Sequence, residues 1–345
     1  MSAEAQALPL VPKQELAPGL RVSRVIKGCW QLSGGHKGQR ASDRTAGKAA
    51  VEDFQPFVEA GITTFDTADI YGPSESLIGD YLERKGRGEP AVQVLTKFCC
   101  FGGDMRSVSA KSVRQAVDDS RQRLGVDSID LIQFYWHDYG VRNYVAAAQH
   151  LAAAQEEGLC RHIGVTNFDV PRLKEMLDAG VRIVSNQVQY SLLDRRPENH
   201  MVDFCAERGI ALLPYGTTAG GLLSERYLGL PASRVQVDTY SLSKYASVVR
   251  EVSDWDWLQR LLQALEAVAR RRGASIADVA QRWVLDRPQV AAIIVGARNA
   301  NHVADHRRLF SLQLTDEDRA GIDAVLVGRR TVKGDCYTWE RGGEW

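Results

Sequence analysis

The chain has no excess of charge of either sign. Its 345 residues carry 43 Lys and Arg against 43 Asp and Glu. Proteins that bind nucleic acid or anionic membranes through a broad electrostatic field carry a basic excess, which is missing here. No run reaches the roughly 18 apolar residues that a membrane span requires. We therefore expect neither nucleic acid nor a membrane among its partners.

The cysteines also lack the spacing of a disulfide framework or a metal site. None of the six forms a C-x-x-C pair, and their spacing predicts neither disulfides nor a zinc site, so free thiols in a reducing compartment are expected. The adjacent pair Cys99-Cys100 leaves a redox element open. Residues 1–19 lack the basic and apolar regions of a secretory signal. The expected location is cytoplasmic, with an organellar stroma left open.

Short apolar runs alternate with amphipathic stretches along most of the chain. The predicted strands cover 24–32, 62–66, 92–97, 129–135, 162–165, 184–188, 211–213 and 291–295. Between or after them, helices are predicted over 45–59, 74–83, 110–124, 144–157, 170–177, 199–207, 257–272 and 275–285. Eight β/α units in one chain predict an α/β protein with a closed (β/α)₈, or TIM, barrel, formed as one domain over 1–345.

Three segments depart from this rhythm. Residues 1–19 form an N-terminal extension before the first unit. Residues 216–254 form a βα loop far longer than usual, and such loops lie over the active face of a barrel, so a lid or cofactor loop is expected there. The C-terminal tail, 327–345, carries Tyr337, Trp339 and Trp345, which we expect over the same face.

Polar side chains follow the predicted strands at their carboxyl ends, where barrel enzymes place their chemistry. Three of these residues, Asp66, Lys97 and His137, form an acid–base set with Tyr71 in the loop after the second strand. An ammonium near a phenol stabilises the phenolate and lowers its pKa, and a carboxylate keeps the ammonium charged. This set suits proton donation to an oxygen that gains charge.

Other chemistries fit less well. No G-x-S-x-G segment is present, which disfavours a hydrolase with a nucleophilic serine. Lysine is a rare metal ligand, and the set lacks ligand spacing, so no metal site is predicted.

The ordered motifs resemble the aldo-keto reductase superfamily over roughly residues 20–315. The matching pieces are Gly61-Ile62-Thr63-Thr64-Phe65-Asp66-Thr67-Ala68, Tyr71-Gly72, Leu95-Thr96-Lys97, Asp130-Leu131-Ile132 leading to His137, Ile163-Gly164-Val165-Thr166-Asn167-Phe168, Asn186-Gln187-Val188-Gln189-Tyr190, Pro214-Tyr215, Gly220-Gly221-Leu222-Leu223 and Ile294-Val295-Gly296-Ala297-Arg298. No single piece is specific, but the ordered set is.

The resemblance implies a nicotinamide-dependent oxidoreductase that reduces aldehyde or ketone carbonyls to alcohols, or catalyses the reverse reaction. It implies that Tyr71 is the general acid/base, with Asp66, Lys97 and His137 completing a tetrad. The residues it implies for cofactor binding are Thr166, Asn167, Gln187, Tyr215, Gly216, Thr217, Gly220, Leu222, Gly296, Ala297, Arg298, His302 and His306. Trp30 and Trp136 are the implied substrate walls. Small-molecule carbonyls or sugars are the implied substrates, and a monomer is compatible with the sequence.

The cofactor segment departs from the family pattern at two positions. His302 and His306 stand where Gln and Asn are common, whereas Arg298 is retained. A guanidinium favours a 2′-phosphate, so NADP(H) is expected over NAD(H). If the two histidines become charged at lower pH, cofactor affinity should rise there.

Two other interpretations stay open at this point. The same scaffold resembles regulatory β-subunits of ion channels, which bind cofactor and act through a partner with slow or no turnover. Alternatively, Lys97 could form a Schiff base, as in a barrel aldolase.

Overall fold

Eight parallel strands close into a barrel, as the alternating pattern predicts. The computed structural model describes residues 8–33, 47–86, 88, 90–237 and 239–337. The strands neighbour one another in the order β10-β3-β4-β5-β6-β7-β8-β9. They are β3 (Val25–Gly28), β4 (Thr64–Asp66), β5 (Gln93–Cys100), β6 (Ile129–Trp136), β7 (Cys160–Thr166), β8 (Ile183–Gln189), β9 (Ala211–Tyr215) and β10 (Ile293–Gly296).

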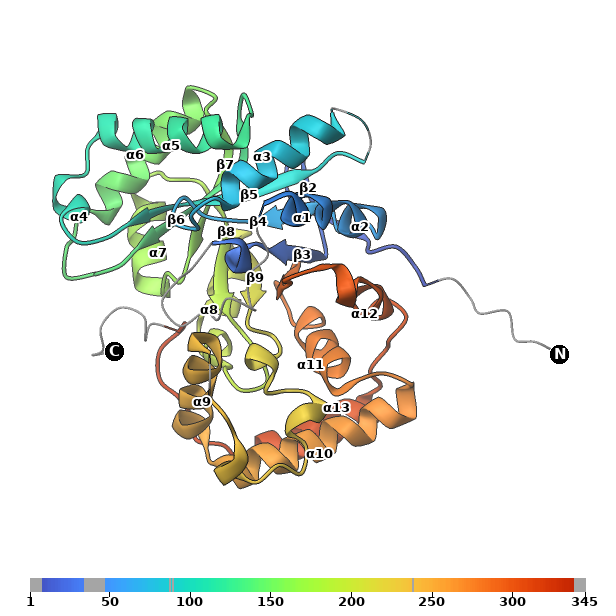
Figure 1. Ribbon diagram of the computed structural model, residues 1–345. Helices are drawn as coiled ribbons and strands as arrows, with labels where there is room; N and C mark the ends of the chain where they lie inside the picture. The colour runs from blue at the N-terminus through green and yellow to red at the C-terminus, as the bar shows by residue number, and fades with distance from the viewer. Residues whose placement is uncertain (1–7, 34–46, 87, 89, 238, 338–345) are drawn as a thin grey trace.

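Helices surround the barrel, and most of the core lies between the two layers (Figure 1). They are α1 (Gly47–Glu52), α2 (Phe54–Glu59), α3 (Ser74–Lys85), α4 (Asp104–Ser107), α5 (Ala110–Leu124), α6 (Tyr144–Glu156), α7 (Val170–Asp178), α8 (Met201–Arg208), α9 (Tyr240–Val252), α10 (Trp255–Arg272), α11 (Ile276–Leu285), α12 (Val303–Arg308) and α13 (Asp316–Leu326). Within the described residues, no helix is long and apolar enough to cross a membrane.

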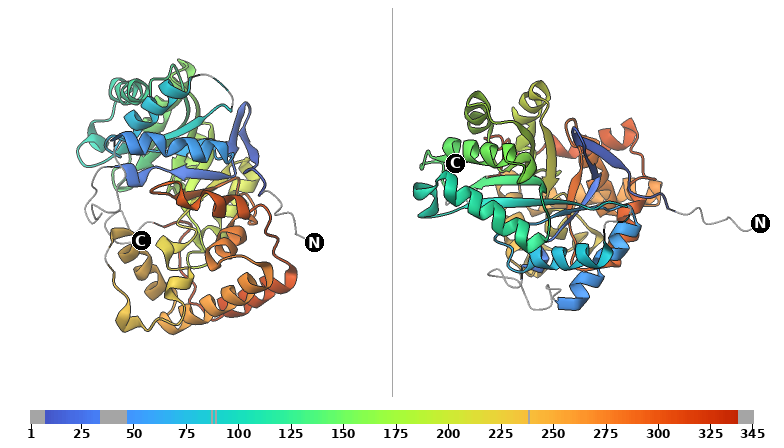
Figure 2. Two further views of the ribbon diagram at one scale, coloured as in Figure 1. Left: turned by 45° about the vertical axis from the view of Figure 1, so that its right-hand side comes forward. Right: turned by 90° about the horizontal axis from the view of Figure 1, so that it is seen from above.

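Part of the predicted N-terminal extension is a hairpin. β1 (Lys13–Ala17) pairs antiparallel with β2 (Leu20–Ser23). Leu16 and Leu20 share an apolar cluster with Ile26, Leu95 and Leu131, which point into the barrel near the starts of their strands. The hairpin therefore closes the end of the barrel opposite the catalytic face, and Figure 2 shows it beside the strands. Residues 1–7 lie outside the described part.

The long loop 216–254 is built of short turns followed by α9. The turns are the 3₁₀ segments η4 (Ala219–Gly221), η5 (Glu225–Tyr227) and η6 (Ala232–Arg234). The C-terminal tail holds the end of α9, because Arg330 donates to the carbonyls of Glu251 (3.0 Å) and Ser253 (2.7 Å). The tail then reaches Asn167, whose carbonyl lies 3.3 Å from the Cys336 thiol. Trp339 and Trp345 lie outside the described residues.

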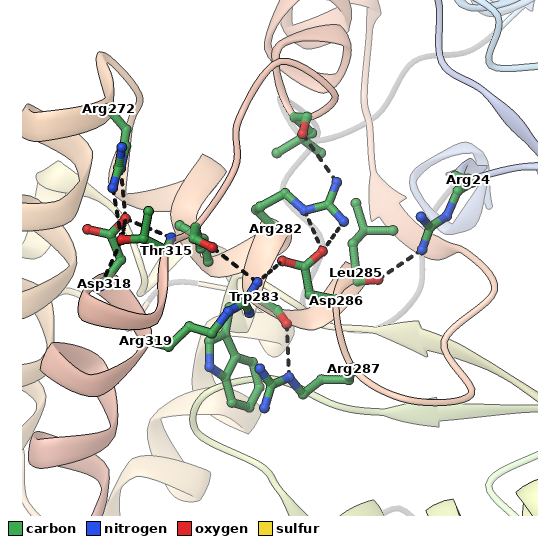
Figure 3. A network of polar contacts seen from close by, with 12 residues as sticks. Arg24, Arg272, Arg282, Trp283, Leu285, Asp286, Arg287, Thr315, Asp318 and Arg319 are labelled. Carbon is green, nitrogen blue, oxygen red and sulfur yellow. Dashed lines mark hydrogen bonds and ion pairs between the residues drawn. The ribbon is translucent and has the colours of Figure 1, made fainter.

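Ion pairs connect α10, α11 and α13 (Figure 3). The carboxylate of Asp318 accepts hydrogen bonds from Arg271 (2.8 Å) and Arg272 (2.7 Å) at the end of α10. The Asp318 carboxylate also completes a capping box with Thr315 at the start of α13. Burial alone would raise the pKa of Asp318, but these hydrogen bonds lower it well below its usual value. One buried carboxylate thus fixes both helix ends.

We expect Asp318→Ala to lower the free energy of unfolding by about 2 kcal/mol, since it removes a cap and two charged hydrogen bonds. Thr315→Ala should cost only about 1 kcal/mol, because it removes the cap and leaves both arginines paired with Asp318. Urea unfolding measures both values. Equal losses in the two variants would contradict a role for the arginine pairs.

Candidate active site

A buried ion pair lies at the carboxyl ends of two neighbouring strands. Lys97 of β5 donates to Asp66, the last residue of β4, across 2.7 Å, and both side chains are 5% exposed. The same ammonium donates to the carbonyl of Thr67 at 2.8 Å. Burial alone would lower the pKa of Lys97, but the Asp66 carboxylate, with smaller contributions from Tyr71 and Cys99, more than offsets burial, and the pKa is raised. Lys97 is therefore held as an ammonium, which disfavours the Schiff-base interpretation because a free amine is the nucleophile there.

Two glutamines complete the surroundings of Asp66. Gln133 donates to Asp66 Oδ2 at 2.8 Å, and Gln187 donates to the same oxygen at 2.7 Å. Gln187 also donates to Gln133 at 2.8 Å. Sequence reasoning missed Gln133, although a glutamine inside an otherwise apolar strand is a signal for a buried polar contact. The sequence predicts that Gln187 contacts the carboxamide of the cofactor. In the structure its amide nitrogen donates to the Asp66 carboxylate.

Tyr71 lies next to this pair. The Lys97 ammonium is 4.9 Å from the centre of the Tyr71 ring, and Tyr71 is half-buried. Burial raises the pKa of the phenol; Lys97 acts in the opposite direction, as expected, but the net shift is upward. The phenol is therefore protonated at neutral pH, and an adjacent ammonium can stabilise the phenolate formed when it gives up its proton.

His137 follows the last residue of β6, and its backbone N–H donates to the carbonyl of Cys100, the last residue of β5, at 3.2 Å. Its Nδ1 lies 3.1 Å from the Tyr135 hydroxyl, and its ring is 5.0 Å from the Phe101 ring. These contacts fix the imidazole beside two aromatic side chains. Tyr135 and Phe101 did not figure in the sequence reasoning.

A further carboxyl group lies in the loop that carries Tyr71. Asp69 Oδ2 accepts from the backbone N–H of Cys99 at 3.0 Å, while Asp69 Oδ1 is buried without a hydrogen bond partner in the described part of the chain. Burial raises the pKa of Asp69 to about 6. Burial and Asp69 also raise the pKa of the Cys99 thiol, which disfavours a reactive thiolate there.

Four of the expected cofactor residues meet on the opposite side of the barrel mouth. Thr166 donates through Oγ1 to the carbonyl of Gln187 at 3.1 Å, and Asn167 donates through its backbone to the same carbonyl at 2.8 Å. Asn167 has a left-handed backbone with φ 59°, and its side-chain oxygen accepts from the Tyr215 hydroxyl at 2.9 Å. The strained loop is thus fixed by hydrogen bonds that orient its amide.

The loop after β9 curves beneath α9. Gly216 and Gly220 both have positive φ, at 70° and 64°. Tyr245 of α9 fills the space beside both, and a Cβ at Gly220 would lie 2.7 Å from its ring. Thr217 and Leu222 are buried in this turn. Glycine is required at both positions for the turn and for the close approach of Tyr245.

The segment after β10 alternates between exposed and buried residues. Gly296 and Arg298 are exposed, whereas Ala297 between them is 6% exposed. A Cβ at Gly296 would lie 2.8 Å from the side-chain nitrogen of Gln31. The amide oxygen of Gln31 is buried without a partner among the described residues. This amide was not singled out from the sequence.

The two histidines of the cofactor segment differ in environment. His302 is exposed, and its Nδ1 lies 2.8 Å from Asp305. His306 is 6% exposed, and neither ring nitrogen has a hydrogen bond partner within the described ranges. Burial lowers the pKa of His306 to about 4, so it stays neutral over the range in which we expected it to become charged.

The structure corrects one of the two substrate walls. Trp136 is 0% exposed, and its indole nitrogen donates to the carbonyls of Asp138 and Val141, both at 2.8 Å. Side chains alternate along a strand, and since Gln133 points into the barrel, Trp136 points outward into the helix layer. It therefore cannot line the mouth. Trp30, in a 3₁₀ turn after β3, is half-exposed and stays a candidate.

His306 generates a pH prediction. In the unfolded chain the His306 imidazole binds a proton near pH 6.5, whereas in the folded chain it binds one only near pH 4. The free energy of unfolding therefore falls as the pH drops through this interval. Between pH 7 and 5, we expect wild type to lose about 2 kcal/mol more stability than His306→Asn. Chemical unfolding at both pH values measures this. Parallel losses in the two proteins would contradict a neutral, buried imidazole.

Comparison with known proteins agrees with this arrangement. The family model described as "Aldo/keto reductase family" matches residues 24–327. A chloroplastic pyridoxal reductase of Arabidopsis thaliana is 30% identical over 92% of this chain and 87% of its own. An NADH-specific methylglyoxal reductase of Escherichia coli is 26% identical, over 87% and 93%. The glycerol dehydrogenase AKR11B4 structure from Gluconobacter oxydans superposes with a TM-score of 0.73 at 26% identity, covering 89% and 92%. The chain belongs to the aldo/keto reductase family.

Proposed function

We propose that this protein is an NADP(H)-dependent reductase of aldehyde or ketone carbonyls, with Tyr71 as the proton donor. The observation that carries the proposal is a protonated phenol whose ring centre lies 4.9 Å from the buried Lys97 ammonium, which Asp66 holds. Membership of the aldo/keto reductase family and the oxidoreductase names of its relatives support the reaction class.

The residues around the mouth fit a nicotinamide dinucleotide. The oriented amide of Asn167 and the ring of Tyr215 suit a planar carboxamide-bearing ring at one end. At the other end, Gln31 Oε1 and both ring nitrogens of His306, which are buried without a hydrogen bond partner among the described residues, suit a group that supplies hydrogen bonds. Gly216, Thr217, Gly220 and Leu222 would lie along the pyrophosphate, and Gly296, Ala297, Arg298 and His302 around the adenosine.

The bound cofactor would supply hydride, and the protein would supply orientation and the proton. As charge develops on the substrate oxygen, Tyr71 gives up its hydroxyl proton to it. Lys97 stabilises the phenolate that is left, and Asp66 with its glutamines keeps Lys97 charged and fixed. His137 orients the carbonyl from the neighbouring strand. Aromatic aldehydes, sugar aldehydes and small dicarbonyls are the substrate classes to screen.

Removal of the Tyr71 hydroxyl tests the proton donor. We expect Tyr71→Phe to lower kcat for carbonyl reduction by about a hundredfold or more, because general acid catalysis is lost, while the cofactor Kd changes little. The matched control is Tyr81→Phe, which removes a buried hydroxyl bonded to Gln55 outside the site and should keep full activity. Absorbance of the reduced nicotinamide measures turnover. Full activity of Tyr71→Phe would sink the assignment.

A cofactor titration tests the phosphate preference. We expect wild type to bind NADPH at least tenfold tighter than NADH, about 1.4 kcal/mol, and Arg298→Ala to lose that difference. Quenching of tryptophan fluorescence gives both Kd values. An equal affinity of wild type for the two cofactors would contradict the phosphate preference, and tighter binding of NADH would match the name of the NADH-specific relative. Tight binding without turnover on any carbonyl would favour the regulatory role instead.

A further inference from the structure

A lysine is buried beneath the proposed phosphate-binding segment. Lys27, in the middle of β3, is 1% exposed. Its neighbour Ile26 points into the barrel, so Lys27 points outward, where its ammonium lies 4.7 Å from the Phe57 ring and 5.4 Å from the Phe54 ring of α2. Lysine is rarely buried without a partner charge, so its presence in this apolar layer requires a reason.

The ammonium makes one described hydrogen bond, to the carbonyl oxygen of Ala297 at 3.0 Å. No ion pair within the described ranges includes it, and Asp53 at the start of α2 acts on it only at longer range. Burial lowers the pKa of Lys27, and the depressed pKa of His306 arises partly from the same positive charge. Two aromatic rings and a carbonyl therefore contact the ammonium, Cys29 and Asp53 act on it only through their charges, and its burial is costly.

That hydrogen bond fixes the direction of the next peptide group. Peptide units are planar and almost always trans, so a carbonyl and the following N–H point in opposite directions. Lys27 draws the Ala297 carbonyl into the buried layer, and the N–H of Arg298 is consequently turned outward, beside the exposed Arg298 side chain. A charged donor on the carbonyl also polarises the peptide and strengthens its N–H as a donor.

We propose that Lys27 is a positioning residue for cofactor choice, which anchors the Ala297–Arg298 peptide so that it presents its N–H and guanidinium to the 2′-phosphate of NADP(H). This role rests on the proposed function. It adds a residue of β3 to a phosphate site that otherwise consists of the segment after β10.

The stability of a Lys27 variant separates this role from a structural one. Methionine has similar length, contacts phenylalanine rings well and carries no charge. Because a buried cation without a carboxylate is unfavourable, Lys27→Met should unfold at the same temperature as wild type or higher. A lysine kept only for packing would give the opposite result.

The experiment is a pair of titrations, NADPH and NADH, on wild type, Lys27→Met and Phe57→Leu, with thermal unfolding of each protein without cofactor. We expect Lys27→Met to lower the ratio of the NADH Kd to the NADPH Kd by at least about fivefold, since one charge-assisted anchor is lost. Phe57→Leu, the matched control, should unfold at a lower temperature and keep the wild-type ratio. If Lys27→Met does not fold, Lys27→Leu, which also removes both the donor and the charge, gives the same comparison.

Two results overturn the role of Lys27. In the first, wild type prefers NADPH and Arg298→Ala does not, yet Lys27→Met keeps the wild-type ratio of the NADH Kd to the NADPH Kd. The other is an equal loss of both affinities with a lower unfolding temperature. A wild type that binds neither cofactor would instead remove the proposed function, and the role of Lys27 with it, so the two failures are distinguishable.

Discussion

The carboxylate of Asp66 is the group on which the site depends. It accepts hydrogen bonds from Lys97, Gln133 and Gln187, so a single side chain at the end of β4 ties together β5, β6 and β8. A buried carboxylate is stable only when its oxygens are satisfied, and here each donor comes from a different strand. Closure of the barrel is what brings them within reach. The charge of Lys97, and the field at Tyr71, follow from this arrangement.

Burial sets the protonation states around this centre. It outweighs the ammonium at Tyr71 and keeps the phenol protonated, as a proton donor requires. It also keeps His306 neutral and makes the charge of Lys27 costly. Neither His306 nor Lys27 has a described carboxylate partner; Lys27 donates to Ala297 in the segment proposed to hold the adenosine phosphate, and His306 lies in α12, which follows that segment. Groups that lower folding stability in this way are found where function retains them.

Much of this architecture is predictable from the sequence, because parallel strands of a barrel deliver their carboxyl ends to one face. Asp66, Lys97 and Asn167 could be placed in one pocket on that ground alone. The closed barrel and the family are confirmed. The hairpin before β3 was not expected, since its two short strands are joined by a turn inside what looked like an extension.

Finer features needed the structure. The outward direction of Trp136 follows from strand alternation, but only once Gln133 is known to face inward. The net pKa of Tyr71 depends on how deeply the phenol is buried, which no local pattern reveals. Lys27 looked like an ordinary lysine within an apolar run, and its contact with Ala297 joins residues 270 positions apart. Contacts of this kind are set by the closing pair of strands, β10 and β3.

The central claim is that the site transfers a hydride to a carbonyl carbon. The most direct measurement supplies NADPH deuterated at the transferable position of nicotinamide C4 with a panel of aromatic aldehydes, sugar aldehydes and small dicarbonyls, and analyses the alcohols by mass spectrometry. The account predicts one deuterium on the former carbonyl carbon of the preferred substrate. Retention of the label on a tightly bound cofactor, with no labelled alcohol from any class, would contradict it.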